Sequence, residues 1–239
     1  MRINVYISAA GYCSRRAAER LVINNQVTIN GKLATKNDLV EEGDIVRVDD
    51  RIIVPDMEKV YLVLNKPRGI VCTGLRSVPG NIIDFVKYPI RVFPVGRLDK
   101  ESEGLILLTN DGPIAHKILH SEHGHEKEYI VTVDQLITEK FITDMGDGVK
   151  IGSVTTKKCT VSLVNDSTFR IILTQGLNRQ IRKMCKALGY RVVKLQRIRI
   201  LNIELGNLEE GKWRHLTENE LFLLEKQIQE EEKYNENHN

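Results

Sequence analysis

The sequence contains no long hydrophobic run. None of its 239 residues belongs to an apolar stretch of the roughly 20 residues that a membrane-spanning helix needs, so a membrane protein is not expected. The first residues, Met1-Arg2-Ile3-Asn4, lack the apolar core of a signal peptide, which predicts a cytoplasmic protein. A hydrophobic fraction of 41% and a charged fraction of 28% are typical of an ordinary globular chain.

Paired cysteines are also absent. The four cysteines are far apart and form no C-x-x-C pair: Cys13, Cys72, Cys159 and Cys185. This pattern argues against a structural zinc site or a disulfide framework and predicts reduced thiols. Four histidines crowd into ten residues and could suggest a metal: His116, His120, His123 and His125. Because no cysteine lies nearby and the segment after His120 is polar, we expect a solvated loop, or histidines near phosphate groups of a partner, and no metal.

Acidic residues are missing from two segments. Residues 178–199 contain eight Lys or Arg and no acid, and residues 1–37 contain six bases against Glu19 alone. The chain as a whole carries only +3, so its remaining segments are net acidic. Because neutralising phosphates releases counterions, such segregation predicts a polyanion partner such as nucleic acid. A basic face that only keeps the protein in solution is the alternative.

Residues 1–54 are predicted to form a small module. Ser8 to Cys13 suggests a short helix that ends at Gly11, and Ser14 is placed to cap a second helix that runs through Ile23. The second helix carries three bases near one face: Arg15, Arg16 and Arg20. Short alternating strands follow, around the Asn30-Gly31 turn. About fifty residues bury little surface alone, which predicts an appended module joined by a linker over residues 55–59.

Residues 60–226 alternate short strands with occasional helices. Helical patterns cover residues 112–120, 138–145, 179–188 and 218–228. This mixture predicts an α+β domain with a large mixed, mostly antiparallel sheet rather than a doubly wound one. Residues 227–239 contain few apolar side chains and are predicted to be disordered.

A polar loop separates two apolar strands in FPVGRLDKESEGLILLTNDG, residues 93–112. Asp99 lies in this loop with arginines available to pair, so we expect it to remain ionised. Such a carboxylate can attack an anomeric carbon or remove a proton from a sugar. The spacing alone, however, favours a solvated turn.

The segment QGLNRQIRKMCKALGY, residues 175–190, predicts a basic helix. Ile181, Cys185 and Leu188 would pack inward, and the bases would occupy the remaining surface: Arg179, Arg182, Lys183 and Lys186. Asn178 is placed to cap this helix. An ordinary solvated helix is the alternative, although one without any acid is unusual.

Three segments, in order, resemble the signature motifs of RsuA-type pseudouridine synthases: VGRLDKESEGLILLTNDG, HEKEYIVTV and GLNRQIRKMCKALGY. The first 50 residues resemble the S4 RNA-binding domain that many members carry. VTTKKCTVSL and LNRQIRKMCKALGYRVVKLQRIRI are similar to the RluF branch, which acts on large-subunit ribosomal RNA. The resemblance therefore implies an S4-like α/β module followed by a pseudouridine-synthase catalytic domain.

The resemblance assigns three catalytic residues. Asp99 matches the aspartate required for breaking the uridine N1–C1′ bond and rejoining the uracil through C5. Tyr129 matches the tyrosine that stacks on the uracil, with a hydroxyl that can assist proton removal at C5. Arg182 matches the base that pairs with the catalytic carboxylate. Attack by Asp99 on C1′ and removal of the C2′ proton both fit the sequence.

The resemblance also implies residues that contact RNA. Arg97 would displace the flipped uridine, Ile181 would line the pocket, and Lys66 would have a supporting role. Further RNA contacts are expected from Asn178, Arg179, Gln180, Arg15, Arg16 and Arg20. The expected partner is 23S rRNA, without a cofactor, in a monomer; a transfer RNA as a second substrate stays open. A non-catalytic RNA-binding or ribosome-assembly protein is the alternative that charge segregation alone fits equally well.

Overall fold

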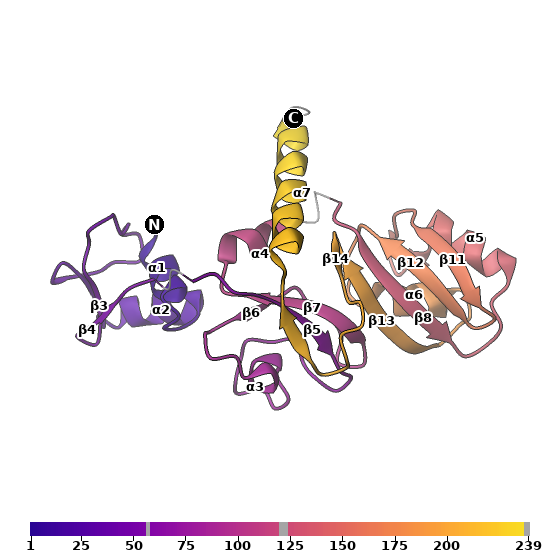
Figure 1. Ribbon diagram of the computed structural model, residues 1–239, viewed down its shortest axis with the longest axis horizontal. Helices are drawn as coiled ribbons and strands as arrows, with labels where there is room; N and C mark the ends of the chain where they lie inside the picture. Colours follow the sequence, from indigo (N-terminus) through magenta and orange to yellow (C-terminus); the bar gives the residue numbers. More distant parts are fainter. Residues whose placement is uncertain (56–57, 120–123, 237–239) are drawn as a thin grey trace. The chain divides into compact units, whose positions relative to one another are not determined.

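The computed structural model describes residues 1–55, 58–119 and 124–236 (Figure 1). Its contacts divide the chain into two compact units. One contains Met1–Val60, together with the short segments Tyr88–Val92 and Asn110–Gly112, and the other contains the rest. No helix in the described ranges has both the length and the apolar composition needed to cross a bilayer.

The first unit holds two helices and a small antiparallel sheet. Its helices are α1 (Ile3–Ala9) and α2 (Arg15–Ile23), and its four strands lie in the order β2-β1-β3-β4. The strand bounds are β1 Val27–Ile29, β2 Lys32–Leu33, β3 Val46–Val48 and β4 Arg51–Ile53. Ser14 caps α2 as predicted, since its Oγ accepts a 3.3 Å hydrogen bond from the Ala17 N–H.

The first helix lies earlier in the chain than predicted. The sequence pattern placed it over Ser8–Cys13, but α1 covers Ile3–Ala9. The reason is burial: Ile3 and Ile7 lie one helical turn apart and are both fully buried in the core of this unit. Gly11, with a φ of 72°, adopts the left-handed conformation just after the helix ends.

The second unit is built on one nine-stranded sheet, which confirms the predicted α+β class. Its main path runs β11-β12-β8-β13-β7-β5-β15, with β14 paired to β13 and β6 paired to β7. Strands β7 and β13 pair in parallel, and the other pairs described in this sheet are antiparallel. The bounds are β5 Tyr61–Lys66, β6 Phe93–Val95, β7 Glu103–Thr109, β8 Lys127–Val133, β11 Thr160–Asn165, β12 Thr168–Leu173, β13 Val192–Ile200, β14 Ile203–Glu204 and β15 Trp213–His215. A separate hairpin joins β9 (Lys150–Ile151) to β10 (Val154–Thr155).

Two hydrophobic clusters attach helices to this sheet. Helices α5 (Glu139–Asp147) and α6 (Gln180–Ala187) share a cluster with β8, β12 and β13. Helices α4 (Gly112–Leu119) and α7 (Glu218–Glu236) share another with β5, β7 and β14, and α3 covers Ile82–Val86. Thr138 caps α5, since its Oγ1 accepts a 3.1 Å hydrogen bond from the Phe141 N–H.

The structure corrects the expected disorder of the tail over residues 227–236. Helix α7 continues to Glu236, and Leu224 and Ile228 on it are buried. Glutamate, glutamine and lysine are good helix formers, and Lys226 lies 3.8 Å from Glu230 one turn later. Residues 227–236 contain few apolar side chains, but they continue a helix that buried side chains already anchor to the sheet. Residues 237–239 lie outside the described residues.

The register of the strands places four residues in one row across the sheet. Tyr129 on β8 lies opposite Arg197 on β13, Arg197 lies beside Gly104 on β7, and Gly104 lies opposite Lys66 on β5. Residues opposite one another in neighbouring strands point to the same face of a sheet. A Cβ atom at Gly104 would lie 2.2 Å from the Arg197 carbonyl oxygen, so only glycine allows β7 and β13 to approach this closely.

Candidate active site

Asp99 lies in the loop between β6 and β7, and several backbone contacts hold this loop in place. The Ser102 N–H donates a 3.0 Å hydrogen bond to the Asp99 carbonyl oxygen and closes a tight turn. Leu98 is buried, and its N–H donates to the Cys72 Sγ at 3.4 Å. The Gly69 N–H donates to the Lys100 carbonyl oxygen at 2.8 Å. The loop is thus an anchored element and not the solvated turn that spacing alone favoured.

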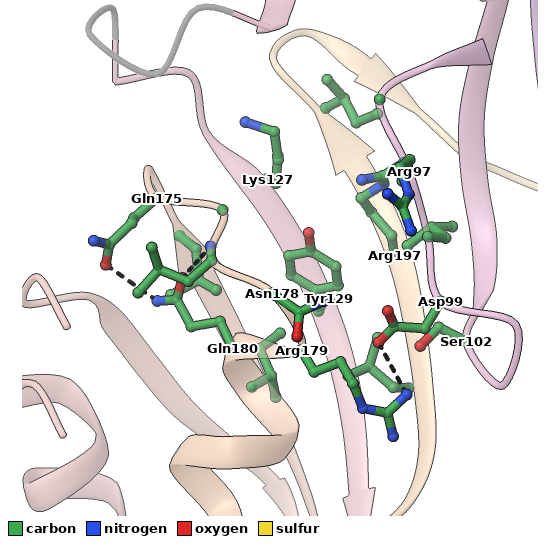
Figure 2. Close-up of a pocket in the computed structure, with 18 of the residues that line it drawn as sticks. Arg97, Asp99, Ser102, Lys127, Tyr129, Gln175, Asn178, Arg179, Gln180 and Arg197 are labelled. Carbon is green, nitrogen blue, oxygen red and sulfur yellow. Dashed lines mark hydrogen bonds and ion pairs between the residues drawn. The ribbon is translucent and has the colours of Figure 1, made fainter. Parts of the chain in front are cut away.

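The Asp99 side chain reaches a cavity of about 450 Å³ within the second unit (Figure 2). Seven other residues that the sequence pointed to also line it: Arg97, Tyr129, Asn178, Arg179, Gln180, Ile181 and Arg182. Residues more than 80 positions apart therefore meet in one place. Arg15, Arg16 and Arg20 are exposed on α2 of the first unit.

The cation nearest the Asp99 carboxylate is Arg179. Its Nη1 lies 3.7 Å from Asp99 Oδ2 and 2.7 Å from Glu101 Oε2. The short bond to Glu101 lowers the pKa of that carboxyl and raises the pKa of Arg179. Arg179 also has a φ of 52°, in the left-handed region that non-glycine residues rarely adopt. The chain accepts this conformation at the residue that bridges two carboxylates of the Asp99 loop.

Arg182 lies beneath the same loop. Its Nη2 donates to the Glu101 carbonyl oxygen and to Ser102 Oγ, both at 3.2 Å. Burial, followed by the charge of Arg179, lowers the pKa of Arg182. In this structure, therefore, the ion pair expected between Arg182 and Asp99 is made by Arg179, while Arg182 supports the loop backbone.

Tyr129 and Ile181 form the apolar part of the cavity wall. Tyr129 projects from β8, and its half-buried ring lies between the Asn178 loop and the Asp99 loop (Figure 2). Ile181, at 5% exposure, comes from the first turn of α6. A flat ring beside an aliphatic side chain provides a surface on which a planar base can stack.

The start of α6 differs from the prediction. Arg179, and not Asn178, occupies the cap position, and no side chain caps the helix. Gln180 is buried instead, and its Oε1 accepts a 2.9 Å hydrogen bond from the Leu177 N–H. Gln180 thus fixes the turn before the helix. Asn178 is exposed at the cavity, where its Oδ1 accepts from Lys183 Nζ at 3.4 Å.

Lys66 is fully buried and lies outside the cavity lining. Its Nζ donates to the carbonyl oxygens of Pro67 at 2.8 Å and Ile70 at 3.0 Å. Burial lowers the pKa of this amine. Through these contacts Lys66 holds the turn after β5 in place without lining the cavity.

Two charged cavity residues were missed by the sequence reasoning. Arg197 is 3% exposed, and its Nε donates a 2.7 Å hydrogen bond to the Leu105 carbonyl oxygen. Lys127 donates to the His125 carbonyl oxygen at 3.1 Å; burial, followed by the charge of Arg197, lowers its pKa to about 8. Lys127 lies two residues before Tyr129 on the same strand, so period-two alternation could have placed it on the same face.

The histidine cluster is described only in part, since His120 and His123 lie outside the described residues. Over residues 1–55, 58–119 and 124–236, no three His, Cys, Asp or Glu side chains are arranged to hold a metal ion. His125 is buried, with Nδ1 2.9 Å from the Ile118 carbonyl oxygen.

Comparison with known proteins matches both units. The RNA pseudouridylate synthase family model matches residues 60–187, and the S4 domain model matches residues 1–46. The chain is 51% identical to the dual-specificity RNA pseudouridine synthase RluF of Salmonella typhi over 230 residues, which cover 95% of this chain and 80% of the relative. It is 32% identical to the ribosomal large subunit pseudouridine synthase B of Bacillus subtilis over 231 residues, which cover 93% of this chain and 95% of the relative.

A solved structure supports the same assignment. The crystal structure of a pseudouridylate synthase superposes with a TM-score of 0.69 at 30% identity, and the match covers 94% of this chain and 99% of that one. The family match decides for the enzyme and against the non-catalytic alternative. The chain therefore belongs to the RsuA-type pseudouridine synthases with an N-terminal S4 domain, enzymes that isomerise uridine to pseudouridine in RNA.

Proposed function

We propose that Asp99 is the catalytic carboxylate and that the cavity around it receives a uridine flipped out of the RNA. The observation that carries this proposal is the position of its side chain, 30% exposed at the cavity, on a loop held by backbone hydrogen bonds. An anchored carboxylate is already oriented for reaction with the sugar. It either adds to C1′ as the N1–C1′ bond breaks or removes the C2′ proton to give a glycal.

Tyr129 and Ile181 hold the uracil while it is free of the sugar. The Tyr129 ring stacks on the base, Ile181 packs against it, and the tyrosine hydroxyl assists loss of the C5 proton. Arg97, exposed beside the cavity, takes the place that the flipped uridine leaves in the RNA. All atoms of the uridine are retained in the product, so the reaction consumes no cofactor.

Arg179 and Arg182 divide the work on the Asp99 loop. Arg182 fixes the loop through Glu101 and Ser102, and Arg179 balances the charges of Asp99 and Glu101. Lys66 supports the turn that follows β5. Asn178 and Gln180 complete the RNA-facing loop before α6.

The proposed substrate is 23S rRNA. One relative is named for the ribosomal large subunit, and the relatives that are 51% identical are named as dual-specificity enzymes, so a transfer RNA is proposed as a second substrate. Residues 1–54 would contribute RNA affinity through Arg15, Arg16 and Arg20, residues 55–59 would link them to the catalytic domain over 60–226, and the protein would act as a cytoplasmic monomer.

Carbodiimide primer extension on 23S rRNA and on transfer RNA tests the substrate. A single new stop in 23S rRNA treated with the wild type, and none with Asp99→Asn, is the expected result. A stop in transfer RNA alone would remove ribosomal RNA as the substrate. Asp147→Asn, which changes an exposed carboxylate paired with Lys158 outside the cavity lining, is the matched control and should give the wild-type stop.

A further inference from the structure

Arg197 is a buried cation of the cavity wall that the chemistry described so far does not use. Arg197 is 3% exposed, and its Nη2 is buried with no hydrogen-bond partner in the described part of the chain. Its Nε is already occupied by the Leu105 carbonyl oxygen. Burying a charged group whose hydrogen bonding is incomplete is costly, so a guanidinium in the cavity wall indicates that an acceptor on a ligand completes its bonding.

The sheet fixes where this guanidinium lies. Arg197 is directly opposite Tyr129 across the β8–β13 pair, so both side chains project to the same face. On its other side lies Gly104, which has no side chain to compete for the space. Arg197 and Arg97 both line the cavity, and Figure 2 draws both on the side of the Asp99 loop. The guanidinium is therefore a neighbour of the ring on which the base would stack.

The surroundings of Arg197 are rich in positive charge. Lys127 and Arg97 line the same cavity, and no carboxylate of the described residues lies within ion-pair distance of the Arg197 guanidinium. A buried cation without a counterion stabilises negative charge that develops close to it, because water does not screen the interaction.

We propose that Arg197 binds a carbonyl oxygen of the flipped uracil and stabilises the negative charge that the base acquires when its glycosidic bond breaks. This inference rests on the proposed function of the cavity. When the N1–C1′ bond breaks, its electron pair passes to the uracil and spreads over N1 and the carbonyl oxygens. The C5–C1′ bond then forms, C5 loses its proton, and N1 gains one, so no electron or atom is left over.

The experiment compares two substrates in one variant. Arg197→Gln, which removes the charge, should lower the single-turnover rate on a 23S rRNA fragment carrying the target uridine by about 10²–10³-fold, the usual effect of removing one donor to a developing anion. The affinity for that fragment should stay within a few-fold of the wild type. Arg76→Gln, an exposed arginine outside the cavity lining, is the control and should keep the wild-type rate.

The second substrate carries 5-fluorouridine at the target position. Fluorine lowers the basicity of the departing uracil, so its negative charge needs less stabilisation by the protein. The loss of single-turnover rate in Arg197→Gln should therefore shrink at least tenfold. Because C5 then carries no proton to lose, the readout is consumption of the 5-fluorouridine in a nuclease digest, measured by mass spectrometry.

Equal deficits on both substrates would overturn the proposal, because a structural role would not depend on the leaving group. A loss of affinity as large as the loss of rate would also overturn it and would assign Arg197 to an RNA phosphate. If Arg197→Gln does not fold, Arg197→Lys, which keeps the charge but loses the forked donor, carries the same comparison. Failure of the proposed function shows separately, as activity retained in Asp99→Asn.

Discussion

Replacing Lys127 by methionine tests the electrostatics of the cavity through stability. The amine is buried among cations, and its pKa falls from 10.5 to about 8. In the unfolded chain the amine is protonated up to pH 10.5, so near pH 7 the fold must hold a charge that it disfavours. Stability from this group is therefore lowest below pH 8 and rises as the pH approaches 10.5. Methionine keeps the aliphatic stem and removes the charge.

The magnitude follows from the shift. A difference of about 2.5 pKa units at 1.36 kcal/mol each gives an upper limit of about 3.4 kcal/mol by which burial of the charged amine weakens the fold at pH 7. At pH 9.5 the same two pKa values give a destabilisation of the fold of about 1.4 kcal/mol. The stability gained by Lys127→Met should thus fall by about 2 kcal/mol between pH 7 and pH 9.5.

Urea denaturation at several pH values measures this difference. The single tryptophan, Trp213, lies in β15 of the second unit, so its fluorescence follows unfolding of the part that contains Lys127. Lys140→Met, which alters an exposed surface ion pair on α5, is the matched control and should show little dependence on pH. A gain from Lys127→Met that is independent of pH, or a loss of stability at pH 7, would refute the reasoning.

Three further predictions follow from the Asp99 loop and its supports. Gly104→Ala should lower the free energy of unfolding by about 3 kcal/mol or more, because the added Cβ meets backbone at a φ of 100°; thermal unfolding measures it, and a change under 1 kcal/mol would contradict it. Glu101→Gln should lower the single-turnover rate several-fold, because Arg179 loses its 2.7 Å partner and is free to close on Asp99; an unchanged rate would show that Glu101 does not restrain it. Tyr129→Phe should bind RNA as the wild type does with slower single turnover, and an unchanged rate would exclude a chemical role for the hydroxyl.

Local rules predicted much of the fold. The cap of α2, the strands on either side of Asp99 and the largely antiparallel sheet follow from short-range patterns of polarity and turn residues. The position of α1 did not, since burial of Ile3 and Ile7 in the module core decided it. The continuation of α7 depends on its anchored first turns, which a composition average over residues 227–239 does not represent.

The candidate site was likewise predicted only in part. Asp99, Tyr129 and Arg182 were identified from motifs, whereas Arg197 was not, because its role depends on lying opposite Tyr129 and beside Gly104. Such pairing between distant strands leaves little trace in a single sequence. Arg179, and not Arg182, pairs with Asp99. This pairing likewise depends on the left-handed backbone conformation of Arg179 at the start of α6.

The most direct test of the central claim is tritium release from RNA labelled at C5 of uridine, measured in single turnover with the wild type, Asp99→Asn and the control Asp147→Asn. Only conversion to pseudouridine through C5 releases this label. The account predicts stoichiometric release with the wild type and with Asp147→Asn, and none with Asp99→Asn although it still binds the RNA. Release by Asp99→Asn at a rate near that of the wild type would contradict the assignment of Asp99 as the catalytic carboxylate.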